Sequence, residues 1–263
     1  MKRIIHAELL RLLRRRSILI ATGGAVLFSL VATLTVFASA RSAGGGPSRR
    51  AGTTLAALSD HGGGTEAFAV GASFVGFLVF VTFIALVAVE FSGGTFRALL
   101  LRDPHRLGVI VGKVTGIFLV VAAMVALAEA CTFVVSWIVA PTKDVTTAEW
   151  LSLRSVGAGL RDYATVLSGV AGWAVFGTTL AVIFRSAPLA LGVGFAWAGP
   201  FENIVVDSWK AGYRLFPGQV LASLIQGGTT ELGFGRAALT ATLYVGIAGV
   251  VALTLVSRRD VTA

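Results

Sequence analysis

One short, charged segment between two long apolar stretches carries most of the chemistry that the sequence offers. It runs from Glu90 to Lys113. Because each apolar flank is long enough to cross a bilayer, we expect the segment to emerge as a loop at one membrane face. Its Ser and Gly residues predict a turn and a helix start, and Phe96 and Leu99 fall three residues apart on one helical face. The sequence therefore predicts a short amphipathic helix over 92–103.

This predicted helix combines an apolar stripe with basic edges. Leu100 extends the stripe, and Arg97, Arg102 and Arg106 supply the cations. Such a helix suits a groove in a soluble partner protein, but it also suits the lipid interface, where apolar side chains enter the membrane and arginines meet phosphates. The residues alone leave both interpretations open.

The composition of the whole chain predicts a membrane protein, whose spans would position this loop. Only 13% of the 263 residues are charged and 56% are apolar, whereas a soluble domain has about 25% charged residues. The net charge of +9 does not indicate a nucleic-acid partner, because the cations cluster at span ends. We therefore expect one all-α, polytopic domain over residues 1–263, with six transmembrane helices at 17–39, 67–89, 114–140, 163–184, 187–206 and 237–256.

Two further elements and the orientation follow from the charge pattern. Residues 1–16 are amphipathic and basic, which predicts an interfacial helix on the membrane surface, and 207–235 is apolar but broken by Pro and Gly, which favours a re-entrant outer element. With both termini inside, the inner segments hold 13 Lys and Arg against four acids, and the outer segments hold nine against eight. We therefore predict cytoplasmic termini.

Within the predicted third span, Glu129 is the one ionisable side chain far from either end. Thr132 and Ser136 follow at helical spacing, so the span has a polar face. The functional interpretation is a translocation pathway or a proton-linked carboxylate, and the alternative is a structural group bonded to a neighbouring span. Both stay open.

A glycine stripe and a near-match to a nucleotide motif lie at the start of the same span. Gly108, Gly112 and Gly116 recur every four residues, which favours close helix packing. The run ending in Lys113 is not a P-loop, because it lacks the required glycine spacing and has Val114 where Ser or Thr is needed. The histidines are far apart, so we predict no metal site, and no catalytic residue is indicated.

The loop also resembles that of a known family. It resembles the loop between spans two and three of permease subunits of ABC-type exporters, the ABC type-2 membrane-domain class. Pro104 departs from the pattern, since it lies two residues before Arg106 where three is usual. The residues that match in order and spacing are Glu90, Gly94-Thr95, Arg97, Leu99-Leu100, Arg106 and Gly112-Lys113.

This resemblance implies that the short helix is a coupling helix, with Glu90, Gly94, Thr95, Phe96, Arg97, Leu99, Leu100, Arg102 and Arg106 at the docking site. ATP and Mg would be bound by a separate ATPase subunit, so this chain is expected to carry no cofactor and not to be an enzyme. Two permease copies, identical or related, would form the pathway in a bacterial inner membrane, surrounded by lipid. The apolar lining suggests a hydrophobic or amphipathic cargo.

Two other functions remain open on the residues. One is a proton-coupled secondary transporter that uses Glu129, although such carriers have inverted repeats that we do not find here. The other is a membrane anchor or assembly factor that transports nothing.

Overall fold

The computed structural model describes residues 2–40, 53–102 and 105–259, together with the backbone but not the side chains of Arg97, Leu100 and Arg102. These residues form helices and turns, with no strand among them. Six helical segments in the described part are long and apolar enough to cross a membrane: Arg15–Ser39, Glu66–Ser92, Arg106–Lys143, Leu153–Phe184, Ala187–Ser208 and Phe234–Arg258. The predictions of an all-α fold and of six candidate spans are confirmed.

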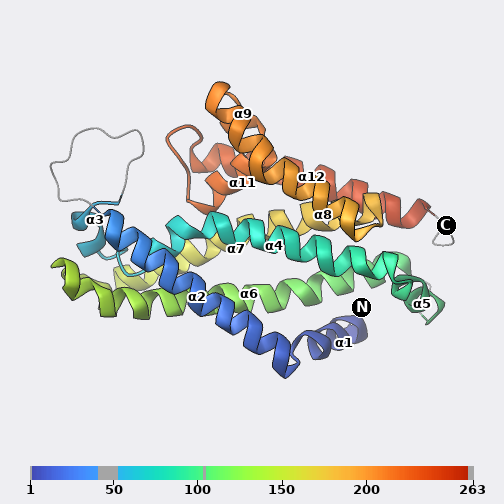
Figure 1. Cartoon of the computed structure of the whole chain (residues 1–263), viewed down its shortest axis with the longest axis horizontal. Helices are drawn as coiled ribbons and strands as arrows, with labels where there is room; N and C mark the ends of the chain where they lie inside the picture. The colour runs from blue at the N-terminus through green and yellow to red at the C-terminus, as the bar shows by residue number, and fades with distance from the viewer. Residues whose placement is uncertain (1, 41–52, 103–104, 260–263) are drawn as a thin grey trace.

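The long helices lie roughly parallel to one another in three layers (Figure 1). Helices α4 (Glu66–Ser92) and α7 (Leu153–Phe184) form the middle layer and pack extensively on each other. Helices α2 (Arg15–Ser39) and α6 (Arg106–Val139) cover one side of this pair. The other side is covered by α8 (Ala187–Ala196) and α12 (Phe234–Arg258).

Small residues let the two central helices come close. A Cβ on Gly177 of α7 would lie 2.6 Å from the Phe80 carbonyl oxygen of α4, and a Cβ on Gly76 would lie 2.6 Å from the Trp173 ring. The Phe80 and Trp173 rings then pack with their centroids 4.9 Å apart. Because lipid gives apolar helices no hydrophobic drive to associate, this close contact is the main source of attraction between them.

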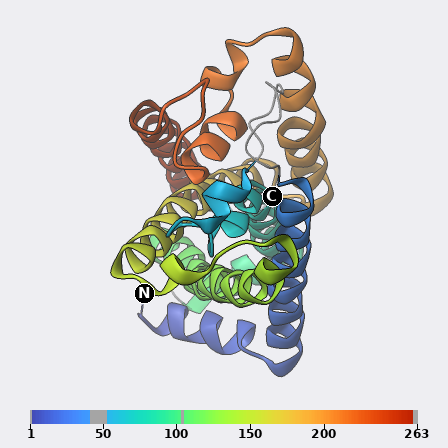
Figure 2. The same cartoon turned by 90° about the vertical axis from the view of Figure 1, so that its left-hand side faces the viewer.

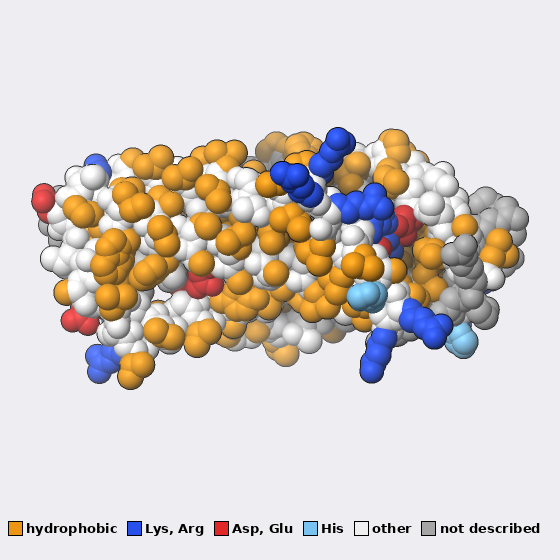
Figure 3. Space-filling model, turned by 90° about the horizontal axis from the view of Figure 1, so that it is seen from below, with side chains coloured by type: hydrophobic (Ala, Val, Ile, Leu, Met, Phe, Trp, Pro, Cys, Tyr) orange, Lys and Arg blue, Asp and Glu red, His pale blue; other side chains and the backbone are white. Residues whose placement is uncertain are grey.

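Both described chain ends lie at one end of the molecule, which we call the termini end. Here α1 (Lys2–Leu12) lies across the bundle (Figures 1 and 2), and α5 (Thr95–Arg102) joins α4 to α6 (Figure 1). Lys and Arg side chains gather toward this end, beside a long hydrophobic band with few charges (Figure 3). This distribution of side chains is typical of a protein whose hydrophobic band lies in lipid and whose basic end lies in water.

The opposite end, which we call the far end, is closed by short elements. Helix α3 (Leu55–Ser59) and two 3₁₀ turns, Ala140–Lys143 and Ala148–Leu151, pack around Trp150. The buried Trp150 donates its indole N–H to the Leu58 carbonyl at 3.0 Å.

The second half of the fifth span and the chain that leads to the sixth span consist of short helices. A π-helical turn, Trp197–Phe201, contains Pro200 and leads into α9 (Glu202–Ser208). Two short helices follow, α10 (Gly212–Leu215) and α11 (Pro217–Ile225), and one face of α11 is buried against α7 and α12.

Several helix bounds differ from those predicted. The third span was expected to begin at residue 114, but α6 begins at Arg106, and the fourth was expected at 163, but α7 begins at Leu153. Both extensions carry charged residues, which a search for apolar runs excludes. The short helix predicted over 92–103 begins at Thr95, because Ser92 ends α4, and residue 103 lies outside the described residues.

Candidate functional site

A buried ionic cluster joins three helices at the termini end. It contains Glu8 and Arg11 of α1, Glu90 of α4 and Lys113 of α6. The Lys113 ammonium lies 2.7 Å from Glu8 Oε2 and also contacts Glu90 Oε1. Arg11 Nη1 lies 2.6 Å from Glu90 Oε1 and 3.6 Å from Glu8 Oε1. Two carboxylates thus meet two cations, and the cluster is neutral as a whole.

The three inner members of this cluster are almost completely removed from solvent. The Lys113 side chain is 3% exposed, and those of Glu8 and Glu90 are also buried, whereas Arg11 is 45% exposed. Burying charges is costly, so each buried ion depends on its partners, and removing one of the buried partners costs about 3–5 kcal/mol. The cluster therefore fixes α1 against the corner where α4 ends.

The sequence makes room for α1 at this corner. A Cβ on Gly116 of α6 would lie 2.9 Å from the Glu8 Cβ, so only glycine admits α1 at this distance. Around Glu8, the apolar residues Ile4 and Leu12 pack against the main core. The face of α1 that was expected to meet lipid is therefore partly buried against the protein.

Of the predicted packing glycines, Gly116 thus takes part directly in a contact between helices. Gly112 is buried within α6. A Cβ placed on Gly108 would lie 3.7 Å from the Cβ of His105, one turn earlier in the chain.

The same corner positions α5. Gly94 adopts a positive φ of 70°, which reverses the chain after α4, and the Thr95 hydroxyl donates to the Glu90 carbonyl at 3.3 Å. Phe96 is only 2% exposed, and its ring centroid lies 4.6 Å from that of Phe91 on α4. Phe96, predicted as part of a docking stripe, therefore faces the protein body and attaches α5 to α4.

The outward surface of α5 consists of other residues. Leu101 is 83% exposed and Leu99 is 37% exposed. The side chains of Arg97, Leu100 and Arg102, which were also predicted to dock, lie outside the described residues. Exposed leucines on a helix that is anchored from behind suit contact with another protein.

Basic residues from three helix ends surround the base of α5. The Arg185 guanidinium, in the link between α7 and α8, lies 5.7 Å from the centre of the Phe91 ring. Burial, together with the charges of Arg259 and Arg106, lowers the pKa of Arg185 below its usual value. Arg106 donates to the Arg259 carbonyl at 3.2 Å, and Arg259 donates to the Ile183 carbonyl at 3.1 Å. Arg106 thus ties α6 to the end of α12.

The predicted pathway residues do not share one surface. Thr132 and Ser136 are fully buried. The Thr132 hydroxyl and the Ser29 hydroxyl of α2 both donate to the Ala128 carbonyl, at 2.8 and 2.9 Å, so Thr132 lies in the contact between α2 and α6. Glu129 instead faces α7, where a Cβ on Gly159 would lie 3.3 Å from its Oε1. Glu129 and Thr132 therefore face different neighbouring helices.

The sequence analysis missed two buried carboxylates. Glu8 was counted only as a charge, although its place among the apolar residues of α1 could have indicated a buried partner. Glu202, 1% exposed, accepts hydrogen bonds from the Gly218 and Gln219 backbone N–H groups at 3.3 and 3.2 Å. It therefore stabilises the N-terminus of α11.

Comparison with known proteins gives one family. The sequence model of a family described as "Protein of unknown function (DUF2705)" matches residues 54–262. No curated protein matches the chain.

Proposed function

The chain belongs to this family of unknown function, and from its architecture we propose that it is the membrane-spanning permease subunit of an ATP-driven exporter of the ABC type-2 membrane-domain class. The observation that carries the proposal is the way α5 is built. It is a short helix at the termini end. Its buried Phe96 attaches it to the bundle, and its Leu101 side chain is exposed. A helix that only rested in lipid would not need such an attachment.

Two sets of contacts connect α5 to the rest of the helix bundle. Phe96 packs on Phe91, so force on α5 passes directly to α4. Glu90, the residue directly before Phe91, contacts Arg11 of α1 and Lys113 of α6. Because buried, paired groups resist separation, a push on α5 would move α1, the end of α4 and the start of α6 together.

In this mechanism a separate ATPase subunit contacts the exposed side chains of α5, Leu101 foremost and Leu99 at its edge. ATP binding and hydrolysis in that subunit displace α5, and the bundle alternates between two arrangements by rigid-body movement. The ATPase can drive the change only if it contacts α5 differently in the two states. The ATP and Mg belong to the partner subunit.

The proposal assigns the termini end to the cytoplasm of a bacterial inner membrane. The basic side chains at that end support this orientation. Helix α1 then lies at the inner membrane surface as an interfacial helix, fixed by the ionic cluster, and α10 and α11 form a re-entrant element near the outer surface. Two permease copies, identical or related, complete the pathway for a hydrophobic or amphipathic substrate.

Co-purification tests this function. We expect the tagged chain, extracted from its native membrane in mild detergent, to carry a P-loop protein that hydrolyses ATP. The double variant L99D/L101D should lose that protein, because it replaces the two exposed leucines of α5 with carboxylates.

The matched control is L151D/L153D, which changes two exposed leucines at the far end. It should keep the partner and insert equally well. The proposal fails if no ATP-hydrolysing protein accompanies the wild-type chain, or if both double variants retain the ATPase equally.

A further inference from the structure

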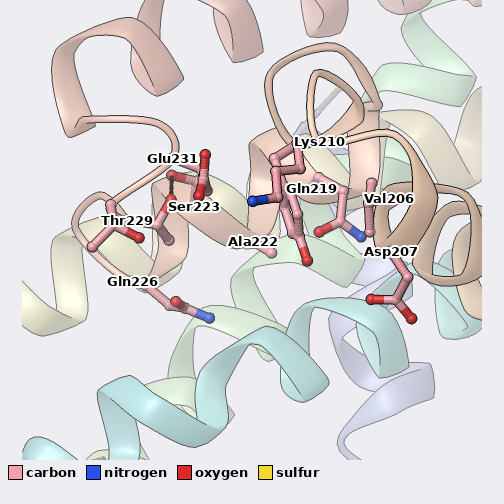
Figure 4. A pocket seen from close by; sticks show the side chains of 11 residues that line it. Val206, Asp207, Lys210, Gln219, Ala222, Ser223, Gln226, Thr229 and Glu231 are labelled. Carbon is pink, nitrogen blue, oxygen red and sulfur yellow. Dashed lines mark hydrogen bonds between the residues drawn. The ribbon is translucent and has the colours of Figure 1, made fainter. Parts of the chain in front are cut away.

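A polar groove lies over α11, on the part of the chain that links the fifth span to the sixth. Its volume is about 710 Å³, within the range of roughly 300–1,000 Å³ typical of small-molecule sites. Asp207 and Lys210 line one side, and Thr229 and Glu231 line the other (Figure 4). It is separate from the ionic cluster and from α5.

The floor of the groove is one face of an amphipathic helix. Val220, Leu221, Leu224 and Ile225 of α11 are buried in the main core. Gln219, Ser223 and Gln226, on the opposite face, line the groove. The amides of Gln219 and Gln226 can thus meet water or a polar ligand, whereas the Ser223 hydroxyl is buried.

This floor is held in place by hydrogen bonds. Glu202 fixes the start of α11, and the Gln226 amide donates to the Ser73 hydroxyl of α4 at 2.9 Å. Ser223 donates to the Leu232 carbonyl at 2.7 Å, which positions the loop. A site that is already formed loses little conformational entropy when a ligand binds.

Charged side chains of both signs line the groove. In Figure 4, Lys210 lies between Asp207 and Glu231. All three are exposed, and within the described chain none of them forms an ion pair. The Glu231 backbone is held by Arg214, whose Nε donates to its carbonyl at 2.9 Å. A cation and two anions, separated and unpaired, complement a ligand that carries both charges.

An apolar surface adjoins the groove. On the same segment, Ile204 is 67% exposed, and Phe201 and Trp209 are also exposed. Exposed aromatic residues beside a polar site are typical of the membrane–water boundary. A ligand in the groove could therefore keep an apolar tail in lipid.

We propose that this groove binds the zwitterionic head of an amphipathic molecule, with its anionic group on Lys210 and its ammonium group on Glu231 or Asp207. Phospholipid heads that combine a phosphate with an amine have this chemistry. That the ligand is also the exported cargo rests on the proposed function, but its binding does not.

Binding to the purified protein in nanodiscs tests the proposal. We expect native mass spectrometry to detect retention of phosphatidylethanolamine in preference to phosphatidylglycerol, which lacks the ammonium group. K210Q and E231Q should each weaken retention roughly tenfold, the effect of losing one charge-assisted hydrogen bond. The matched controls are K143Q and E149Q, which change exposed charges elsewhere at the far end.

A second measurement separates a lipid from a soluble zwitterion. Calorimetry with glycerophosphoethanolamine and with a neutral dipeptide tests the head group without a tail. Stronger binding of the whole lipid supports an amphipathic ligand, whereas equal binding of the dipeptide would show a site for soluble zwitterions and overturn the amphipathic part of the proposal.

Equal retention of both lipids, or equal loss in the control variants, overturns the proposal. Because these assays need no ATPase, a groove that binds zwitterions in a protein without an ATPase partner would refute the proposed function and leave this inference standing.

Discussion

Replacing Lys113 with methionine should destabilise the protein severely, although it adds apolar surface inside a membrane protein. Lys113 is 3% exposed and contacts both Glu8 and Glu90. In K113M these two carboxylates keep only Arg11, whose side chain is 45% exposed. The variant thus leaves one excess negative charge buried among three helices.

The magnitude follows from the loss of a buried partner, which costs about 3–5 kcal/mol. For a chain of this size, 1 kcal/mol corresponds to roughly 2–4 °C in Tm. We therefore expect Tm to fall by on the order of 10 °C. R11Q should lose about 1 kcal/mol or less, because half-exposed pairs are screened by solvent.

Thermal unfolding of the detergent-purified protein measures these effects. The control is R258M, which removes an exposed cation at the same end and should change Tm little. The double variant E8Q/K113M removes one charge of each sign and leaves Glu90 paired with Arg11. It should therefore be more stable than the sum of the two single effects predicts.

Two results would refute this reasoning. The first is that K113M is no less stable than R258M, which would mean that the cluster contributes little. The second is that the effects of E8Q and K113M on Tm are strictly additive, which would mean that Glu8 and Lys113 do not act on each other.

Three more predictions follow from other contacts. G116A should lower Tm by several degrees, because its Cβ would displace Glu8, whereas G23A, with nothing within 4 Å, should not. F96A should cost about 3 kcal/mol and speed proteolysis of α5 in inverted membranes, and an unchanged rate relative to L101A would contradict its anchoring role. E129Q should slow transport in vesicles without altering assembly, and a full rate would assign Glu129 to structure.

The apolar spans could be predicted because each one is a long local signal. The fifth span, predicted at 187–206 and observed at Ala187–Ser208, was found despite Pro200 because its hydropathy stays high, but its π-helical turn was not predicted. The start of α6 was missed for a different reason. Lys113 looked like the edge of a span, and only its contact with Glu8, far away in the chain, lets a lysine lie inside a buried helix.

In the candidate site, too, features that depend on neighbouring residues in the sequence could be predicted, whereas those that depend on packing between distant residues could not. The turn at Gly94 and the helix after it are encoded locally, so they were predicted. Whether Phe96 faces a partner or the protein depends on Phe91 and on the packing behind it, which periodicity cannot determine. Likewise, helical spacing placed Thr132 near Glu129, but the neighbours α2 and α7 determine which side chain is buried where.

Site-specific photo-crosslinking from α5 tests the central claim most directly. A photoreactive amino acid in place of Leu101, activated in native membranes, should cross-link to a P-loop ATPase, and the yield should change when ATP is added. The same amino acid in place of Leu153, which is 91% exposed at the far end, should give no such product. Absence of an ATPase from the Leu101 products, or equal cross-linking from both positions, would contradict the account.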